Sequence, residues 1–424
     1  MATVRRLGVL VLFLCTPRPL AAEDWPRFRG PTGQGQSAET DLPLRWSATD
    51  NVAWKTDLPG EGGSSPIVHG DRVFLTTAGE EGASCHVLCL DRRAGRILWD
   101  KEVFRQVPST KRPENTYATP TPVTDGTNVF AVFADGSFAA VDYAGAVVWT
   151  NRTIKHFSLH GLAASPILYQ DLLIMPFDGT STGPDKWVGF EKPWDGCFVV
   201  ALDKRTGRER WRARRGPARI AHTTPVVVTA EGRDILLSNA GDVLQTHDPR
   251  TGERLWSLAT EGSGVAPSVV TGGGLIFASS GFGKSAVRAV ELRAANGPPP
   301  VRWTQRRAVP IVASPVYAEH RLYQVTEKGI AACLDARTGE ILWQERLGGT
   351  HYASPIHAAG RVYFLSEEGE GTVVAAAARF RLLARNALGE QCRASYAAAA
   401  GHLFIRTNKR LYCVGKPEGR PGSH

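Results

Sequence analysis

Cysteine is scarce in this sequence, with seven residues among 424, and no two of them are adjacent or form a Cys-x-x-Cys motif. The spacing therefore contains no sign of a cysteine-ligated metal site. Cys89, Cys333 and Cys413 occupy one position of a repeat described below, where two other copies have Ala140 and Ala201. A position that alternates between Cys and Ala is typical of small, buried packing residues. Whether any cysteines pair stays open, even in an exported chain.

Long apolar runs are also lacking after the first 22 residues, so we expect no transmembrane span. The chain starts with two early arginines, an apolar stretch over residues 7–15 and the small pair Ala21-Ala22. This order is typical of a secretory signal peptide, which we place at residues 1–22 with cleavage near Ala22. We therefore expect an exported protein, located in the periplasm or outside the cell.

Charge of one sign is not concentrated in any segment. The formal net charge is +9, but the basic residues are scattered with acids between them, as around Lys204-Arg205 and Arg306-Arg307. Such a pattern favours a solvated rim over a surface for an anionic polymer. We therefore expect no nucleic-acid partner.

A phrase that does recur consists of an apolar residue or His followed by Asp, then a Gly turn, and a Trp four residues after the Gly. The five copies end at Trp99, Trp149, Trp211, Trp256 and Trp343. The Asp can cap the turn and the Gly accepts a positive φ, so each phrase predicts a β-hairpin. A period of about 40–50 residues built from short apolar runs and Gly turns is typical of a propeller blade.

A second recurring element is a Ser-Pro or Thr-Pro pair that opens an apolar run. The pairs are Ser65-Pro66, Thr121-Pro122, Ser165-Pro166, Thr224-Pro225, Ser314-Pro315 and Ser354-Pro355, with Ala266-Pro267 as a variant. Proline has no N–H, so it suits the first residue of a strand. Each unit then continues through a second apolar run to the hairpin, which gives four antiparallel strands per unit.

Counting the units predicts an all-β, eight-bladed propeller, with seven blades as the alternative. Trp303 closes a degenerate unit, and the unit opened by Pro355 lacks a Trp. The last unit ends at Val414 one strand short, and the strand around Trp54 can supply the missing one, which would close the ring without a free edge. We interpret the tryptophans as wedges packed between blades: Trp54, Trp99, Trp149, Trp211, Trp256, Trp303 and Trp343.

These residues resemble the pyrroloquinoline-quinone-like (PQQ-like) β-propeller repeat family, whose Leu-Asp-x-x-Thr-Gly-x-x-x-Trp phrase is the one given above. The resemblance covers residues 43–415, between an N-terminal extension at 23–42 and a flexible tail at 416–424. The opening Asp24-Trp25-Pro26-Arg27-Phe28-Arg29-Gly30-Pro31 resembles the start of secreted members from planctomycete-like bacteria. The family contains quinoprotein dehydrogenases and non-enzymatic propellers such as the periplasmic lipoprotein of the outer-membrane barrel assembly machine, so the resemblance alone does not choose a function.

Candidate binding residues gather on one face of the predicted ring. Strand alternation places the loops between blades on the same face as the insertions at 104–118, 151–162 and 178–196, opposite the Thr-Gly hairpins. Side chains just ahead of the strand openings point to the channel mouth, where they could bind a metal or an acidic group, or merely cap loops: Tyr117, His160, His222, His351 and Tyr352. Trp187 and Trp194 in the longest insertion are candidate contacts.

The resemblance leaves three functions open. A quinoprotein dehydrogenase would hold pyrroloquinoline quinone and calcium through acids and an amide, and the alcohol-oxidising enzymes add an adjacent Cys-Cys pair that this chain lacks. The acids near the mouth match no such motif: Glu61, Glu114, Glu261 and Asp195. We therefore predict a monomeric, non-catalytic scaffold without catalytic residues, metal or cofactor, which binds a protein or cell-envelope component. A small quinoprotein and a polysaccharide-binding propeller are the alternatives.

Overall fold

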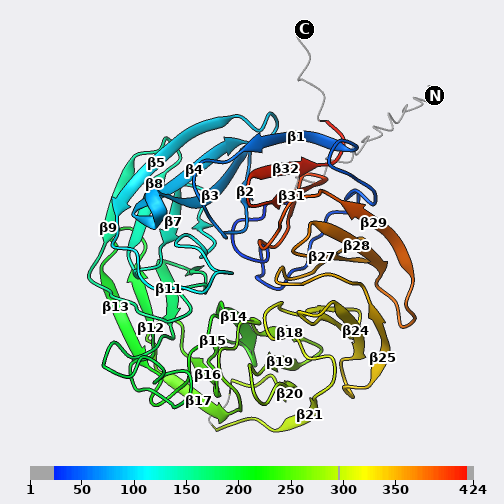
Figure 1. Ribbon diagram of the computed structural model, residues 1–424. Coiled ribbons are helices and arrows are strands. Elements are labelled where there is room, and N and C mark those ends of the chain that lie inside the picture. Colours follow the sequence, from blue (N-terminus) through cyan, green and yellow to red (C-terminus); the bar gives the residue numbers. More distant parts are fainter. Residues whose placement is uncertain (1–22, 295–296, 418–424) are drawn as a thin grey trace, which may run out of the picture.

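Eight four-stranded antiparallel sheets stand around a central channel in the computed structural model, which describes residues 23–294 and 297–417 (Figure 1). The predicted all-β, eight-bladed propeller is therefore confirmed, and the seven-bladed alternative is wrong. First strands of neighbouring blades contact one another, so they surround the axis, and the fourth strands form the rim. The sheets are numbered here as blades 1 to 8 in chain order.

The first four blades follow one another along the chain, each with its strands in sequence order. Blade 1 consists of β2 (Ile67–His69), β3 (Arg72–Gly79), the 3₁₀ turn η1 (Glu80–Gly82), β4 (Ser84–Asp91) and β5 (Ile97–Arg105). Blade 2 consists of β6 (Val123–Thr124), β7 (Asn128–Val132), β8 (Phe138–Asp142) and β9 (Val147–Asn151). Blade 3 consists of β10 (Ile167–Tyr169), β11 (Leu172–Phe177), β12 (Phe198–Asp203) and β13 (Glu209–Arg214). Blade 4 consists of β14 (Val226–Ala230), β15 (Arg233–Asn239), β16 (Val243–His247) and β17 (Arg254–Ala259).

The next three blades repeat the arrangement, and the eighth uses both ends of the chain. Blade 5 consists of β18 (Val270–Gly272), β19 (Leu275–Ser279), β20 (Val287–Glu291) and β21 (Val301–Gln305). Blade 6 consists of β22 (Val316–Ala318), β23 (Arg321–Val325), β24 (Ile330–Asp335) and β25 (Ile341–Arg346). Blade 7 consists of β26 (Ile356–Ala358), β27 (Arg361–Leu365), β28 (Glu370–Ala375) and β29 (Leu382–Ala387). Blade 8 consists of β30 (Ala397–Ala399), β31 (His402–Arg406), β32 (Arg410–Val414) and, on the rim, β1 (Val52–Asp57).

Blade 8 closes the ring as the sequence predicts. Strand β1 pairs antiparallel with β32, with Trp54 opposite Cys413 and Thr56 opposite Leu411. The Gly415 N–H also donates to the Asn51 carbonyl at 2.8 Å. The two ends of the propeller therefore share one sheet, as the blue and red strands in Figure 1 show.

The repeated Trp fastens each blade to the next one. The indole N–H of Trp149 in blade 2, for example, donates to the Lys204 carbonyl in blade 3 at 2.9 Å. The same indole covers Gly207, where an added Cβ would lie 2.4 Å from the ring and φ is +69°. The hairpin Gly is therefore required both for its backbone conformation and for the close approach of the Trp. The same N–H to carbonyl bond is made by Trp54, Trp99, Trp211, Trp256, Trp303 and Trp343.

The one blade without this Trp is blade 7, and the structure gives a reason. Ala384 of β29 lies opposite Val373 of β28, at the position where the other blades have their Trp. The next blade is blade 8, whose outer strands come from opposite ends of the chain and have no hairpin for a Trp to cover. Trp46, from the segment ahead of β1, packs instead in the same buried cluster as Ala384.

All six cysteines that the structure describes are buried and form no disulfide. Cys89 of β4 lies opposite Phe74 of β3 and Trp99 of β5, inside the sheet. Burial raises the pKa of the Cys89 thiol to about 12, so this thiol stays protonated at neutral pH. The question that the sequence left open is thus answered for the described cysteines.

Residues 23–42, which the sequence sets apart as an extension, run across the channel (Figure 1, dark blue). Trp25 pairs with Val68 of β2, and Gln36 pairs with His357 of β26. Arg29 is fully buried and donates to the carbonyls of Ser314 and Pro315 at 3.1 and 2.6 Å. The segment therefore forms a plug inside the ring, and we call residues 23–42 the plug.

Candidate functional site

A closed circle of eight hydrogen bonds surrounds the channel. In each blade a Ser or Thr hydroxyl oxygen at the entry to the first strand accepts the backbone N–H of the equivalent residue in the preceding blade, at 2.9–3.1 Å. The eight residues, which we call the hydroxyl ring, are Ser65, Thr121, Ser165, Thr224, Ser268, Ser314, Ser354 and Ser395. The last bond runs from the Ser395 N–H to the Ser65 hydroxyl and completes the circle.

The hydroxyl ring explains why Ser-Pro and Thr-Pro recur in the sequence. The hydroxyl satisfies a buried N–H of the neighbouring blade, and the proline after it needs no partner of its own. In blade 5 the ring residue is Ser268 rather than Ala266, so the Ala266-Pro267 variant lies two residues ahead of the true opening. Blade 8 has Ser395 without a following proline.

A cavity of about 450 Å³ opens at the hydroxyl ring. All members of the ring except Ser268 line it, and Phe28 reaches it from the plug. Its other walls come from the loops between blades, on the face that carries the insertions, which we call the insertion face. A cavity of this size is within the usual range for small ligands.

The structure brings together three of the five residues predicted at the channel mouth. His160, His222 and Tyr352 line the cavity. The two imidazole rings stack at 6.0 Å between centroids. Burial, aided by the neighbouring His160, lowers the pKa of His222 to about 3, so His222 is neutral at physiological pH. The described residues contain no group of three or more His, Cys, Asp or Glu side chains placed to hold a metal ion.

The other two predicted residues serve the loops instead. The Tyr117 hydroxyl donates to the Ser109 carbonyl at 2.8 Å, and its ring covers Gly82. His351 is buried, with its Nε2 3.0 Å from the Gly348 carbonyl. Neither residue lines the cavity. For these two, the geometry matches the loop-capping interpretation.

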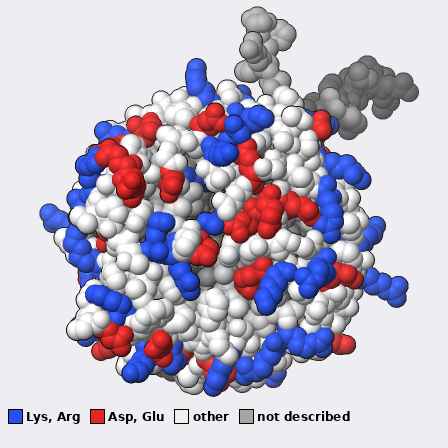
Figure 2. Space-filling view, viewed as in Figure 1, with Lys and Arg blue, Asp and Glu red and all other residues white. Residues whose placement is uncertain are grey.

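Charged residues that sequence reasoning did not single out also line the cavity. The Arg393 guanidinium donates to Glu367 at 2.7 Å and to the Pro113 carbonyl at 3.1 Å. The Glu327 carboxylate accepts the N–H groups of Ile311 and Val312 at 2.5 and 2.7 Å, and burial raises its pKa. Arg112 is also present, as is Glu114, one of the acids considered from the sequence. Basic and acidic side chains alternate over the face seen in Figure 2, without a broad area of one sign.

An aromatic strip leads from the cavity to the surface of the long insertion. Its members are His222, His160, Phe190 and Trp187, with ring centroids 5.1 Å apart for His160 and Phe190 and 5.9 Å for Phe190 and Trp187. Trp187 is 49% exposed, and Phe282, which lines the cavity beside Gly264, is 46% exposed.

Trp194, the other predicted contact, is half-buried. Its backbone pairs with Ala218, and its side chain packs against the cluster around Cys197. It is thus placed to hold the insertion in position, whereas Trp187 faces outward.

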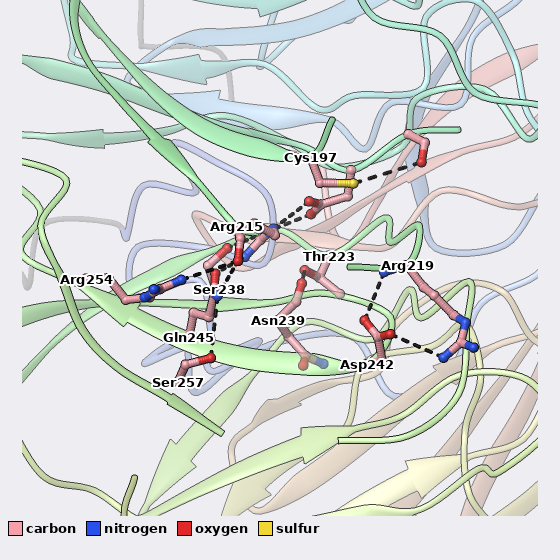
Figure 3. A network of polar contacts seen from close by, with 12 residues as sticks. Cys197, Arg215, Arg219, Thr223, Ser238, Asn239, Asp242, Gln245, Arg254 and Ser257 are labelled. Atoms are coloured by element: carbon pink, nitrogen blue, oxygen red, sulfur yellow. Dashed lines mark hydrogen bonds and ion pairs between the residues drawn. The ribbon is translucent and has the colours of Figure 1, made fainter. Parts of the chain in front are cut away.

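Arg215 holds both ends of the insertion, one through a buried ion pair of its side chain and the other through its backbone N–H (Figure 3). Arg215 donates to both carboxylate oxygens of Asp178, at 2.5 and 2.8 Å, and to the Ser238 hydroxyl at 2.7 Å. The Arg215 N–H donates to the Cys197 carbonyl at 3.1 Å. Asp178 and Cys197 stand at the two ends of the insertion, so this pair fixes its anchorage between blades 3 and 4.

The sequence matches the model of a known protein family over most of its length. The PQQ-like repeat model described as outer membrane protein assembly factor BamB matches residues 47–190, 195–305 and 300–380. The chain belongs to this PQQ-like β-propeller family. The 1-butanol dehydrogenase (quinone) of Thauera butanivorans is 26% identical over 194 residues, which are 42% of this chain and 28% of that enzyme. The match thus spans less than a third of the enzyme's length.

Solved structures share the propeller fold over most of the chain. BamB from Moraxella catarrhalis has a TM-score of 0.60 at 13% identity, covering 88% of this chain and 99% of that one. A europium-containing methanol dehydrogenase has a TM-score of 0.55 at 12% identity, covering 90% and 89%. These likenesses establish the fold and do not choose between an assembly factor and an enzyme. Among the described residues, no helix has the length and apolar character needed to cross a bilayer.

Proposed function

We propose that this chain is an exported, non-catalytic propeller that binds a protein or cell-envelope partner on the insertion face. The observation that carries the proposal is the aromatic strip, which ends at the exposed Trp187, together with the exposed Phe282 in the wall of the cavity. Exposed aromatic residues next to a pocket are typical of the central anchors of protein interfaces. The family model described as an assembly factor supports the same function.

The strip is held in place in a way that suits a preformed docking surface. The ion pair of Asp178 and Arg215 anchors the insertion that carries Trp187, and both side chains are buried. A surface that is fixed before binding loses less conformational entropy when a partner docks. The cavity beside it can receive one side chain of the partner.

The test is a capture experiment with purified mature protein and the envelope fraction of the organism that makes it. The variants are Trp187→Ala and Phe282→Ala, with Val148→Ala as the matched control, because Val148 is also 49% exposed but lies on the rim strand β9. We expect a partner held by wild type and Val148→Ala and reduced about tenfold or more by both aromatic variants, since one anchor contributes about 2 kcal/mol or more.

Equal capture by all four proteins would place the site elsewhere on the ring. Capture of a glycan that depends on Trp187 would favour the polysaccharide-binding function instead. Either result contradicts the proposal, because the proposal requires a protein or envelope component bound through both aromatic residues.

A small quinoprotein is the competing candidate, favoured by the partial match to a quinone-dependent alcohol dehydrogenase. The described residues contain no group of three or more His, Cys, Asp or Glu side chains placed to hold a metal ion, which does not favour a calcium site built on acids. The amide oxygen of Asn115, next to Glu114, already accepts the Thr116 N–H at 3.1 Å and the Thr119 hydroxyl. Pyrroloquinoline quinone with calcium should therefore leave the melting temperature and the quinone absorbance unchanged, whereas a ligand specific for the folded state would raise the melting temperature.

A further inference from the structure

The first backbone nitrogen of the plug is bonded to an acidic side chain of the same segment. The Glu23 N–H donates to Glu39 Oε1 at 3.1 Å. The same carboxylate accepts the N–H groups of Ala400 and Gly401 at 2.8 and 2.9 Å, in the turn between β30 and β31 of blade 8. Glu39 therefore joins the start of the plug to the closing blade.

Glu39 has no cationic partner in the part of the chain that the structure describes. Within residues 23–294 and 297–417, no Lys, Arg or His side chain forms an ion pair with it, and the hydrogen bonds to its carboxylate all come from neutral backbone N–H groups. These bonds are already charge-assisted, because the acceptor is a carboxylate, and a positive charge on one donor would turn that bond into an ion pair and strengthen it further. The only donor that could become charged is the nitrogen of Glu23.

We propose that Glu39 is the receptor for a processed N-terminus at Glu23. Hydrolysis of the bond between Ala22 and Glu23 consumes one water, leaves a carboxylate on Ala22 and frees an ammonium group on Glu23. That ammonium is generated next to the Glu39 carboxylate. The inference rests on the export that the proposed function assumes, and it assigns the cleavage site to one bond.

The new ion pair would fasten the segment that closes the channel. Directly after Glu23, the Asp24 carboxylate accepts the Gly70 N–H at 2.7 Å, and Trp25 pairs with Val68 of β2. Phe28, three residues further on, lines the cavity. Maturation therefore stabilises the same segment that forms one wall of the candidate binding site.

The first test is the mass and the N-terminal sequence of the protein recovered after export. We expect the chain to begin at Glu23. A mature chain that begins at any other residue would overturn the proposal, because its terminal ammonium would then lie outside the reach of Glu39. This result is independent of partner capture, so the two proposals can fail separately.

The second test is a double-mutant cycle on the full mature chain. One chain begins at Glu23, and the other carries a single additional Gly, which turns the Glu23 nitrogen back into an amide. Each is prepared with Glu39 and with Glu39→Gln, and hydrogen exchange is followed in the peptide covering residues 23–40. We expect the extension to speed exchange about three- to tenfold in the Glu39 background, because the ion pair is replaced by a weaker bond from an amide N–H.

The cycle decides whether the two groups act together. In the Glu39→Gln background the extension should change exchange less than twofold, because no carboxylate is left to bind the ammonium. Equal effects of the extension in both backgrounds would contradict the proposal. Asp41→Asn, an exposed acid of the same segment, is the control and should behave as wild type in both chains.

Discussion

The tryptophans show how one residue type serves two purposes in this molecule. Trp211 is 9% exposed, and its indole N–H donates to the Pro249 carbonyl of the next blade at 3.2 Å. Trp187 belongs to the insertion and is 49% exposed. We predict that Trp211→Ala lowers the free energy of unfolding by about 3–5 kcal/mol, whereas Trp187→Ala changes it by about 0.5 kcal/mol at most. Urea denaturation followed by circular dichroism measures both, and similar losses would contradict the distinction.

The pH dependence of stability is set in part by a single buried histidine. His247 of β16 is fully buried, neither ring nitrogen has a hydrogen-bond partner, and burial lowers its pKa to about 3. In the unfolded chain its pKa is about 6.5. The folded state therefore resists protonation, and the stability that is present above pH 6.5 is lost as the pH falls towards 3.

Between pH 7 and pH 5, we expect His247 to lower the free energy of unfolding by about 2 kcal/mol. His247→Gln should remove this part of the pH dependence, and the same substitution at the exposed His320 serves as the control for replacing a histidine. Urea midpoints at pH 7, 6 and 5 provide the measurement. A slope that is the same in His247→Gln and in wild type would show that the imidazole does not control it.

At the scale of the element, the hydroxyl ring joins blades through single bonds at their inner strands. The Ser165 hydroxyl accepts the Thr121 N–H at 3.0 Å. Ser165→Ala leaves this buried N–H without a partner, and we expect a loss of about 1–3 kcal/mol. Ser165→Thr keeps the oxygen, as Thr121 and Thr224 do in their blades, and should cost less than half as much. Urea denaturation of both variants tests this, and equal costs would mean that the side-chain volume matters rather than the bond.

The same elements show how much of the site could be predicted from the sequence. The Ser-Pro pairs predicted where strands begin, and the position of Tyr352 and two histidines at the channel mouth followed from strand alternation. Glu327 could not be found in this way, because it meets Ile311 and Val312 only after two loops of blade 6 fold together. No local pattern encodes such contacts between loops.

At the scale of the whole molecule, closure was predictable and the plug was not. In the sequence, the last unit is one strand short and the strand around Trp54 belongs to no other unit, so the pairing of the two could be predicted. Residues 23–42 carry no strand pattern, because their contacts are made one at a time, as when Arg29 donates to carbonyls of blade 6. Arg29 bonds to backbone carbonyls and not to an acidic side chain, so no pair of opposite charges in the sequence indicates this contact. Burial lowers the pKa of Arg29 to about 9.

Closure through β1 joins residues more than 300 positions apart, so the pairing of β1 with β32 depends on the whole ring having formed. Prolines at Lys55 and Thr56 should remove at least one ladder hydrogen bond and cost about 3 kcal/mol or more. The matched variant places prolines at Thr150 and Asn151 in β9. These positions are equivalent, because the Thr56 side chain donates to the Gly95 carbonyl in the hairpin of the next blade, and the Asn151 side chain donates in the same way to the Gly207 carbonyl.

The two proline variants should differ in where the structure opens. Strand β9 belongs to a local hairpin, so fast hydrogen exchange should stay within β8 and β9 in the control. In the closure variant β30, β31 and β32 lose the strand that ties them to blade 1, and all three should exchange faster than the strands of blades 3 to 5. Retained protection of β30 to β32 would mean that the inner hydroxyl ring, through Ser395 and Ser65, is sufficient to hold the ring shut.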